Sequence, residues 1–228
     1  MKLTLVNDTS YKDIRVVLDS REHFLKKGEN IFEEIPNELQ LKVNIYDKNK
    51  VYFWSMILLN ILFFDWLVGD DFGSAQLMCN SDYIIATNGD ECIVKLSSMS
   101  ATSKNGISYS SVYLDTSSRI ESVFHSINDK ENTKKKLKKR NVQVILFSVV
   151  ISVLLLLINV GIAVCFAVLS LFEVVPSVIR LLKIKDIFSD EQAGLILNEK
   201  ILEVEEEKRN PKGLVESVFG SVFKKRKK

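Results

Sequence analysis

The sequence has few of the residues that usually build catalytic or metal sites. It contains two histidines and three cysteines among 228 residues. His23 and His125 lie in unrelated segments, without metal-ligand spacing to a cysteine. A phosphate-binding glycine loop, a nucleophile elbow and a zinc-protease motif are all missing from the sequence. We therefore expect no cofactor and no metal ion, and a membrane enzyme is the least favoured class of function.

Signals for export and for disulfide bonds are also scarce. Acidic residues interrupt every apolar stretch within residues 1–30, so no signal peptide is predicted there. Three cysteines do not make a disulfide framework, and Cys79 and Cys92 would pair only in an oxidising compartment. Cys165 lies in an apolar run and is expected to be a small packing residue. The N-terminal region is therefore predicted to be cytoplasmic.

The chain has no large excess of either charge. Its 31 basic and 29 acidic residues leave a formal net charge of +2, which argues against nucleic acid as a partner. The charge is segregated instead, with basic clusters beside apolar segments, and this pattern suits an anionic membrane face. The predicted partners are the lipid bilayer and its anionic lipids, together with other membrane-protein subunits or further copies of the chain.

Charge is absent altogether from residues 141–172. A bilayer core of about 30 Å is crossed by roughly 20 apolar residues, whereas a helix over this run would be about 48 Å long. The run is too apolar for a soluble surface and too long for one upright span. The sequence therefore predicts an integral membrane protein.

Both flanks of this apolar run are basic. Residues 128–140 form a predicted juxtamembrane linker, and Arg180, Lys183 and Lys185 follow the run. The cluster expected to contact the membrane surface consists of Lys134, Lys135, Lys136, Lys138, Lys139 and Arg140. Because lysine and arginine favour the cytoplasmic side of a membrane, both ends of the run are predicted to be cytoplasmic.

A helical hairpin over residues 141–180 satisfies this rule. Its limbs are expected at residues 142–158 and 162–178, with a turn at residues 159–161. The predicted location is the cell inner (cytoplasmic) membrane, with both termini in the cytoplasm. One tilted span over residues 144–163 is the alternative arrangement.

The first 127 residues are predicted to form a β-rich domain. Residues 2–6, 13–18 and 39–46 are short β-favouring stretches between turn residues, and the last of them alternates apolar and polar side chains. We expect a small antiparallel, β-sandwich-like sheet with one buried face. No motif in it is specific enough to indicate a family.

Four further segments complete this predicted domain. Residues 83–87 and 91–97 flank an Asn-Gly-Asp turn and are expected to pair as a β-hairpin. Residues 108–115 are predicted to add a strand, and residues 116–127 to form a weak helix or a connector.

Residues 51–68 form a second apolar block, inserted in the β-rich domain. A helix of this length could span, but Asn60 and Asp65 disfavour it, and so does the orientation rule. An interfacial helix with Trp54 and Trp66 near the lipid headgroups is the favoured interpretation; a spanning helix and a buried core helix are the alternatives.

Two helices are expected after the membrane segment. Residues 181–209 are predicted to be a cytoplasmic helix with a Ser189/Gln192 capping box. Residues 210–228 are predicted to be an amphipathic membrane-surface helix, or alternatively a helix that docks on a partner protein. Its membrane contacts are expected from Phe219, Phe223, Lys224, Lys225, Arg226, Lys227 and Lys228.

The fold class predicted is thus an α+β membrane protein: a β-sandwich-like N-terminal domain, a membrane helical hairpin and a C-terminal amphipathic helix. The favoured function is a non-catalytic, membrane-anchored accessory or scaffold subunit of a bacterial membrane complex for transport, secretion or immunity. A membrane-perturbing or pore-forming effector is the alternative, because several apolar or amphipathic segments of one chain can assemble in a bilayer.

Overall fold

The computed structural model describes residues 1–18, 20–33, 35–36, 38–51, 75–87, 90–104 and 106–209. The strands are β1 (Lys2–Asn7), β2 (Ile14–Leu18), β3 (Arg21–Phe24), β4 (Gly28–Phe32), β5 (Glu38–Ile45), β6 (Ala75–Ala86), β7 (Glu91–Thr102), β8 (Ile107–Thr116) and β9 (Arg119–Ile127). The helices are α3 (Lys130–Leu156), α4 (Val160–Leu182), α5 (Ile184–Ile187) and α6 (Asp190–Arg209). Residues 52–68 of the predicted 51–68 helix and the whole predicted 210–228 helix lie outside the described residues.

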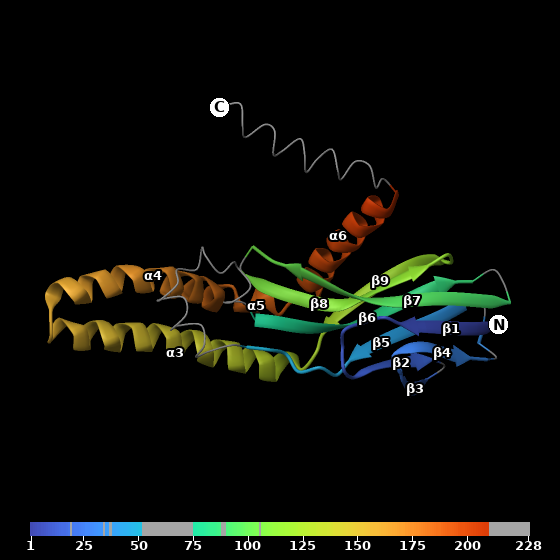
Figure 1. The fold of residues 1–228 in the computed structure, drawn as a ribbon, viewed down its shortest axis with the longest axis horizontal. Helices are drawn as coiled ribbons and strands as arrows, with labels where there is room; N and C mark the ends of the chain where they lie inside the picture. The colour runs from blue at the N-terminus through green and yellow to red at the C-terminus, as the bar shows by residue number, and fades with distance from the viewer. Residues whose placement is uncertain are drawn as a thin grey trace, which may run out of the picture.

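The described strands form one mixed sheet that is curled into a half-barrel (Figure 1). Their order is β3-β2-β5-β6-β8-β7-β1-β4, and β9 lies beside β6. We expected an antiparallel sheet, and this is wrong for two pairs, because β1 pairs with β7 and β6 pairs with β8 in parallel. Both parallel pairs join strands that are far apart in the chain, as the long connection of a parallel pair requires.

The predicted β-hairpin between residues 83–87 and 91–97 is also wrong. Both segments are strands, but β6 pairs with β5, β8 and β9, whereas β7 pairs with β1 and β8. The chain therefore passes from one half of the curled sheet to the other between β6 and β7. The Asn-Gly-Asp sequence indicated that the chain turns between the two strands, but it did not indicate which strands each of them pairs with.

The predicted helix or connector at residues 116–127 is instead the strand β9, which pairs antiparallel with β6. Its sequence conceals the usual alternation, because a polar residue points inward and an aromatic residue outward. His125 is buried, whereas Phe124 is 58% exposed. The strands expected at residues 2–6, 13–18, 39–46 and 108–115 correspond to β1, β2, β5 and β8.

The main core lies inside the curl of the sheet. Alternate residues of β1 and β5 point into it, so that Leu3, Leu5, Leu41 and Val43 are almost completely buried. Strands β2, β6, β7 and β8 also contribute residues to this core. The alternation in β5 thus has the physical cause that the sequence indicated, one buried face and one outer face.

A second core lies between the sheet and the C-terminal helices. Leu77 and Tyr109 of the sheet pack with Phe188, which follows α5, and with Ala193 and Leu197 of α6. The Tyr109 hydroxyl donates a hydrogen bond of 2.7 Å to the carbonyl oxygen of Ile187. Strand β8 is consequently buried on both faces for most of its length.

The predicted helix at residues 181–209 is divided in the structure. Helix α4 continues through Pro176 to Leu182, the short helix α5 follows, and α6 begins at Asp190. The backbone N–H of Gln192 donates to Ser189 Oγ at 3.4 Å, which is one half of the expected capping box.

Candidate functional site

The most distinctive feature of the described chain is a pair of apolar helices that extends away from the sheet (Figure 1). Helices α3 and α4 would be about 40 Å and 35 Å long at ~1.5 Å per residue. Residues 157–159 reverse the chain between them, so the helical hairpin is present. One continuous helix over residues 144–163 is wrong, because α3 ends at Leu156.

The turn lies two residues earlier than the sequence suggested. Asn159 is the N-cap of α4, and its Oδ1 accepts a hydrogen bond of 3.2 Å from the backbone N–H of Ile162. Gly161 lies within α4, where a Cβ would come 3.1 Å from that Oδ1. Glycine at this position therefore leaves room for the cap rather than forming the turn itself.

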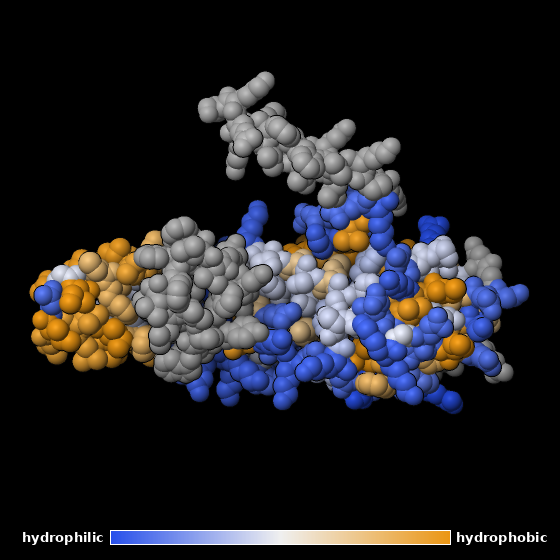
Figure 2. Space-filling model, in the orientation of Figure 1, coloured by the Kyte–Doolittle hydropathy of each residue, from blue (hydrophilic) through white to orange (hydrophobic). Residues whose placement is uncertain are grey.

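Large apolar side chains cover most of the outside of the hairpin, and Figure 2 shows this end of the molecule as mostly hydrophobic. Leu157 and Ile158 at the tip are 81% and 75% exposed. Further exposed members on the two helices are Val142, Leu146, Val149, Val150, Val153, Leu154, Leu156, Val160, Ile162, Val164, Val168, Leu171, Phe172, Val175, Val178, Ile179 and Leu182. Cys165 is also exposed, so its predicted role as a packing residue is wrong.

The buried residues of the hairpin, in contrast, are mostly small or polar. Ser148 of α3 and Ala163, Ser170 and Ser177 of α4 are at most 6% exposed. The Ser170 hydroxyl donates to the carbonyl oxygen of Ala167 in its own helix at 2.9 Å. Small residues between helices with large apolar residues outside are typical of helix pairs in lipid, where there is no water to drive apolar side chains inward.

By length and composition, α3 and α4 are each able to cross a membrane. Their most apolar windows are 22% and 18% buried within the protein, so most of this surface lacks a protein neighbour. Two such helices are compatible with membrane association.

The basic cluster at residues 134–140 is part of α3 rather than a separate linker. Lys135, Lys136, Lys138 and Lys139 are exposed, and Lys134 is partly exposed. Arg140 is only 4% exposed, so its side chain lies within the protein and not on an open basic surface. The other predicted membrane-contact residues, Trp54, Trp66, Phe219, Phe223, Lys224, Lys225, Arg226, Lys227 and Lys228, lie outside the described residues.

The base of the hairpin is joined closely to the sheet. Arg180, near the end of α4, is 8% exposed, and its Nη2 lies 3.0 Å from the position of a Cβ on Gly106. Gly106 belongs to the turn between β7 and β8 and has a φ of +66°. A side chain there would displace Arg180 and strain the turn, so the end of α4 is packed closely against this end of the sheet.

Asn49 joins three elements at this junction. Its Nδ2 donates to the carbonyl oxygen of Asn128 at 2.7 Å and to Thr133 Oγ1 at 2.8 Å. Its Oδ1 accepts from the backbone N–H of Met78 at 2.6 Å. One amide thereby links the end of the sheet, the loop before α3 and the first turn of α3.

Asp190 at the start of α6 makes a similar link. Its Oδ1 accepts from the backbone N–H of Ile127 at 3.0 Å, and its Oδ2 lies 3.0 Å from Lys130 Nζ. Sheet, hairpin and α6 are therefore held together by specific polar contacts in addition to the second core.

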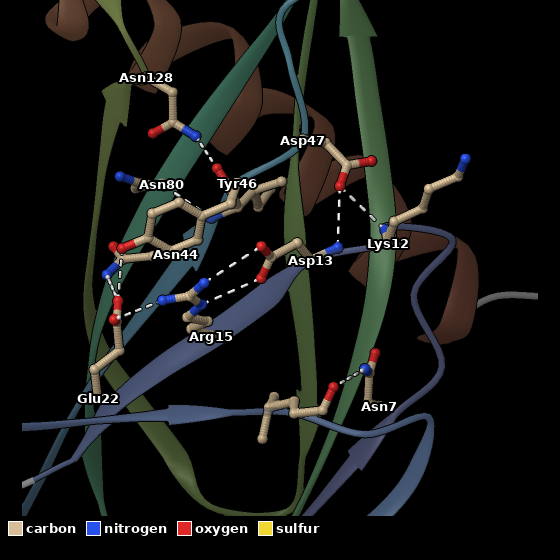
Figure 3. A network of polar contacts seen from close by, with 12 residues as sticks. Asn7, Lys12, Asp13, Arg15, Glu22, Asn44, Tyr46, Asp47, Asn80 and Asn128 are labelled. Atoms are coloured by element: carbon tan, nitrogen blue, oxygen red, sulfur yellow. Dashed lines mark hydrogen bonds and ion pairs between the residues drawn. The ribbon is translucent and has the colours of Figure 1, made fainter.

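A polar cavity of about 620 Å³ lies beside this junction, between the end of β5, the middle of β6 and the start of α3. Its lining residues are Lys42, Asn44, Ile45, Tyr46, Asp47, Lys48, Asn49, Asn80, Asn128, Asp129, Asn132, Thr133 and Lys136. Figure 3 shows the side of this region where Tyr46, Asn44, Asn80 and Asn128 come together. Sequence analysis missed these asparagines, because they come from separate segments that only the fold brings together.

The buried Ser81–His125–Ser111 cluster has the residue types of a catalytic site but no exposure to solvent. Ser81 Oγ lies 2.8 Å from His125 Nδ1, and the three residues are at most 1% exposed. Burial lowers the pKa of His125 to about 4. Ser111 Oγ also donates to the carbonyl oxygen of Cys79 at 3.0 Å, so the cluster satisfies buried polar groups within the sheet.

Among the described residues, no group of three or more histidine, cysteine, aspartate or glutamate side chains is arranged to hold a metal ion. Cys79, Cys92 and Cys165 are free thiols. Comparison with known proteins found no matching family model, no matching curated protein and no matching solved structure.

Proposed function

We propose that this protein is a non-catalytic, membrane-anchored accessory or scaffold subunit of a membrane complex. The α3–α4 hairpin inserts into the cytoplasmic membrane and holds the curled sheet at its cytoplasmic face. The observation that carries the proposal is the inverted arrangement of the hairpin, with large apolar side chains outside and serine and alanine between the helices.

The direction of insertion follows from the charges at the base. Exposed lysines precede the apolar part of α3, and Lys183 and Lys185 follow α4, at the end of the hairpin that joins the sheet. Because lysine and arginine are retained on the cytoplasmic side, this base and the sheet belong in the cytoplasm. The tip, Leu157 and Ile158, then lies deepest in the bilayer or at its far surface.

The surface offered to a partner subunit is the outer face of the β4 side of the sheet. Ile31 of β4 and Ile93 of β7 both lie opposite Thr4 of β1 and are 56% and 60% exposed. Strand β4 is also at one end of the described strand order. Two exposed isoleucines on either side of β1 suit a protein partner.

Two measurements test the anchor. Sodium carbonate extraction of membranes should leave the full chain in the pellet, and its recovery in the supernatant would contradict the proposal. Single cysteines at Ser20, Lys104 and Lys185, in a Cys165→Ser background, should resist an impermeant maleimide in intact spheroplasts and react after lysis. Reaction of all three before lysis would contradict the orientation.

Liposome leakage separates the scaffold from a pore-forming effector. A scaffold that inserts a single hairpin should leave dye-loaded liposomes sealed. Leakage that increases steeply with protein concentration would instead indicate an oligomeric pore and would overturn the scaffold assignment.

A further inference from the structure

The polar cavity at the sheet–α3 junction has the size of a ligand site. Its volume of about 620 Å³ falls within the ~300–1,000 Å³ that is usual for small-molecule sites. The proposed scaffold function does not require this cavity. Its lining groups and its position relative to the hairpin together indicate what it would bind.

Several amide groups in the cavity have unused hydrogen-bonding capacity. Asn80 Oδ1 accepts from the backbone N–H of Ile45 at 2.9 Å, which leaves its Nδ2 without a protein acceptor among the described residues. Asn132 Nδ2 donates to Asp129 Oδ2 at 2.9 Å, which leaves its Oδ1 without a protein donor among those residues. A hydroxyl group both donates and accepts, so a ligand with several hydroxyls matches this mixture of donors and acceptors.

The cavity also carries positive charge. Lys48 and Lys136 line it, and within the described part of the chain neither ammonium group has a carboxylate within ion-pair distance. Three lysines and two aspartates line the cavity, because Lys42 lies there as well. Asp47 Oδ1 accepts from the backbone N–H groups of Lys12 and Asp13, both at 3.1 Å, and Asp129 Oδ2 accepts from Asn132 Nδ2 at 2.9 Å. The lysines outnumber the carboxylates, and the two ammonium groups without an ion-pair partner favour a phosphate ester.

The position of the cavity points to a lipid as the source of this group. Lys136 precedes Asn141, the first residue of the uncharged run, by about 7.5 Å along the helix axis at ~1.5 Å per residue. The headgroup layer extends roughly 5–8 Å beyond the hydrocarbon core on each side. A hairpin inserted up to Asn141 would therefore hold the cavity at the depth of the headgroups.

We propose that this cavity binds the headgroup of an anionic lipid with a hydroxylated phosphate ester, of the phosphatidylglycerol type. Lys48 and Lys136 bind the phosphate, and Asn80 Nδ2 and Asn132 Oδ1 bind the hydroxyls. The inference rests on the proposed membrane anchor for the depth of the cavity, but binding by the cavity itself can be measured without a membrane.

The test uses the purified full chain in mild detergent and native mass spectrometry of bound lipid. Phosphatidylglycerol should bind more tightly than phosphatidylcholine, and Lys136→Gln should weaken its binding by roughly tenfold, as expected for one lost hydrogen bond to a charged group. Asn80→Asp keeps the acceptor for Ile45 but removes the donor and adds a negative charge, so it should weaken binding at least as much. Lys135→Gln is the matched control, since it removes the same charge from an exposed neighbour that does not line the cavity.

Equal weakening by Lys136→Gln and Lys135→Gln would overturn the proposal, because it would show only general attraction to anionic lipid. Glycerol 1-phosphate distinguishes the source of the ligand: the lipid assignment expects weak competition, and binding as tight as that of the lipid would overturn it. If Asn80→Asp does not fold, the two lysine variants decide the question. Carbonate extraction reports on the anchor alone, so failure of the anchor and failure of the cavity are distinguishable.

Discussion

Asn159 and Ile162 close the hairpin through one hydrogen bond of 3.2 Å, from the Ile162 backbone N–H to the Asn159 side-chain oxygen. The bond satisfies one of the free N–H groups at the start of α4, in a tip that is otherwise entirely apolar. Few polar groups are available there to replace it.

Removing this cap should loosen the tip. Asn159→Ala is expected to lower the free energy of unfolding by about 1 kcal/mol, the usual effect of losing an N-cap side chain. Thermal unfolding of the full chain in detergent measures this change. Asn159→Ser is the control, because serine also caps helices and should retain most of the stability; equal losses in both variants would show that the cap is unimportant.

The interface between α3 and α4 should tolerate a larger side chain less well than the outer surface of the two helices does. Ser170→Leu introduces a large side chain where the native residue is 6% exposed, and we expect a loss of about 1–3 kcal/mol from overpacking. Val168→Leu adds bulk on the outside of the same helix, where the native residue is 54% exposed. It should leave the melting temperature in detergent nearly unchanged, and a similar loss in both variants would contradict the observed helix interface.

The junction between sheet and hairpin should depend strongly on Asn49. Asn49→Ala removes three hydrogen bonds and leaves the Met78 N–H without its partner, at a cost of about 2 kcal/mol or more. Hydrogen exchange should increase around residues 128–133 before it increases in the strands. Asn132→Ala removes only one bond, to Asp129, and unchanged protection in both variants would refute the linking role of Asn49.

Acid should destabilise the protein through His125. Its pKa is lowered by burial from 6.5 to about 4, so the unfolded chain takes up a proton at a higher pH than the folded chain does. The stabilising contribution is present above pH 6.5 and is lost as the pH falls toward 4, by about 3 kcal/mol at most, since one pKa unit corresponds to ~1.36 kcal/mol.

Chemical denaturation between pH 7 and pH 4 measures this effect. His125→Gln should have a flatter stability profile than the native chain in that range, because glutamine does not titrate. The difference between the two profiles removes the contribution of the carboxylates, which both proteins share. Parallel profiles would show that His125 remains neutral in both states or is accessible to protons when folded.

The sequence predicted those parts of the fold that depend on local patterns. The alternation of Leu39, Leu41, Val43 and Ile45 identified β5, because one face of that strand meets the core. The uncharged run and the basic residues around it identified the apolar hairpin. Its turn was misplaced by two residues, since Gly161 resembled a turn residue and Asn159 proved to be a helix cap.

The arrangement of the strands and the junction could not be predicted in this way. The parallel neighbours of β6 and β1 depend on contacts between distant segments, and β9 was missed because His125 occupies an inward position. Asn49 and Asn128 belong to different segments and have no recognisable spacing. Their roles follow only from the way the sheet brings the end of β5 next to the start of α3.

Helix α3 runs without interruption from the junction with the sheet, at Lys130, to the tip of the hairpin, at Leu156. A continuous helix is stiff along its length. A tilt of its outer half would therefore turn the attached sheet through a similar angle. Hydrophobic segments adjust their tilt to the thickness of the surrounding bilayer. With the proposed membrane anchor, the curled sheet would thus change its orientation with membrane thickness, and the face it offers to the proposed partner would change with it.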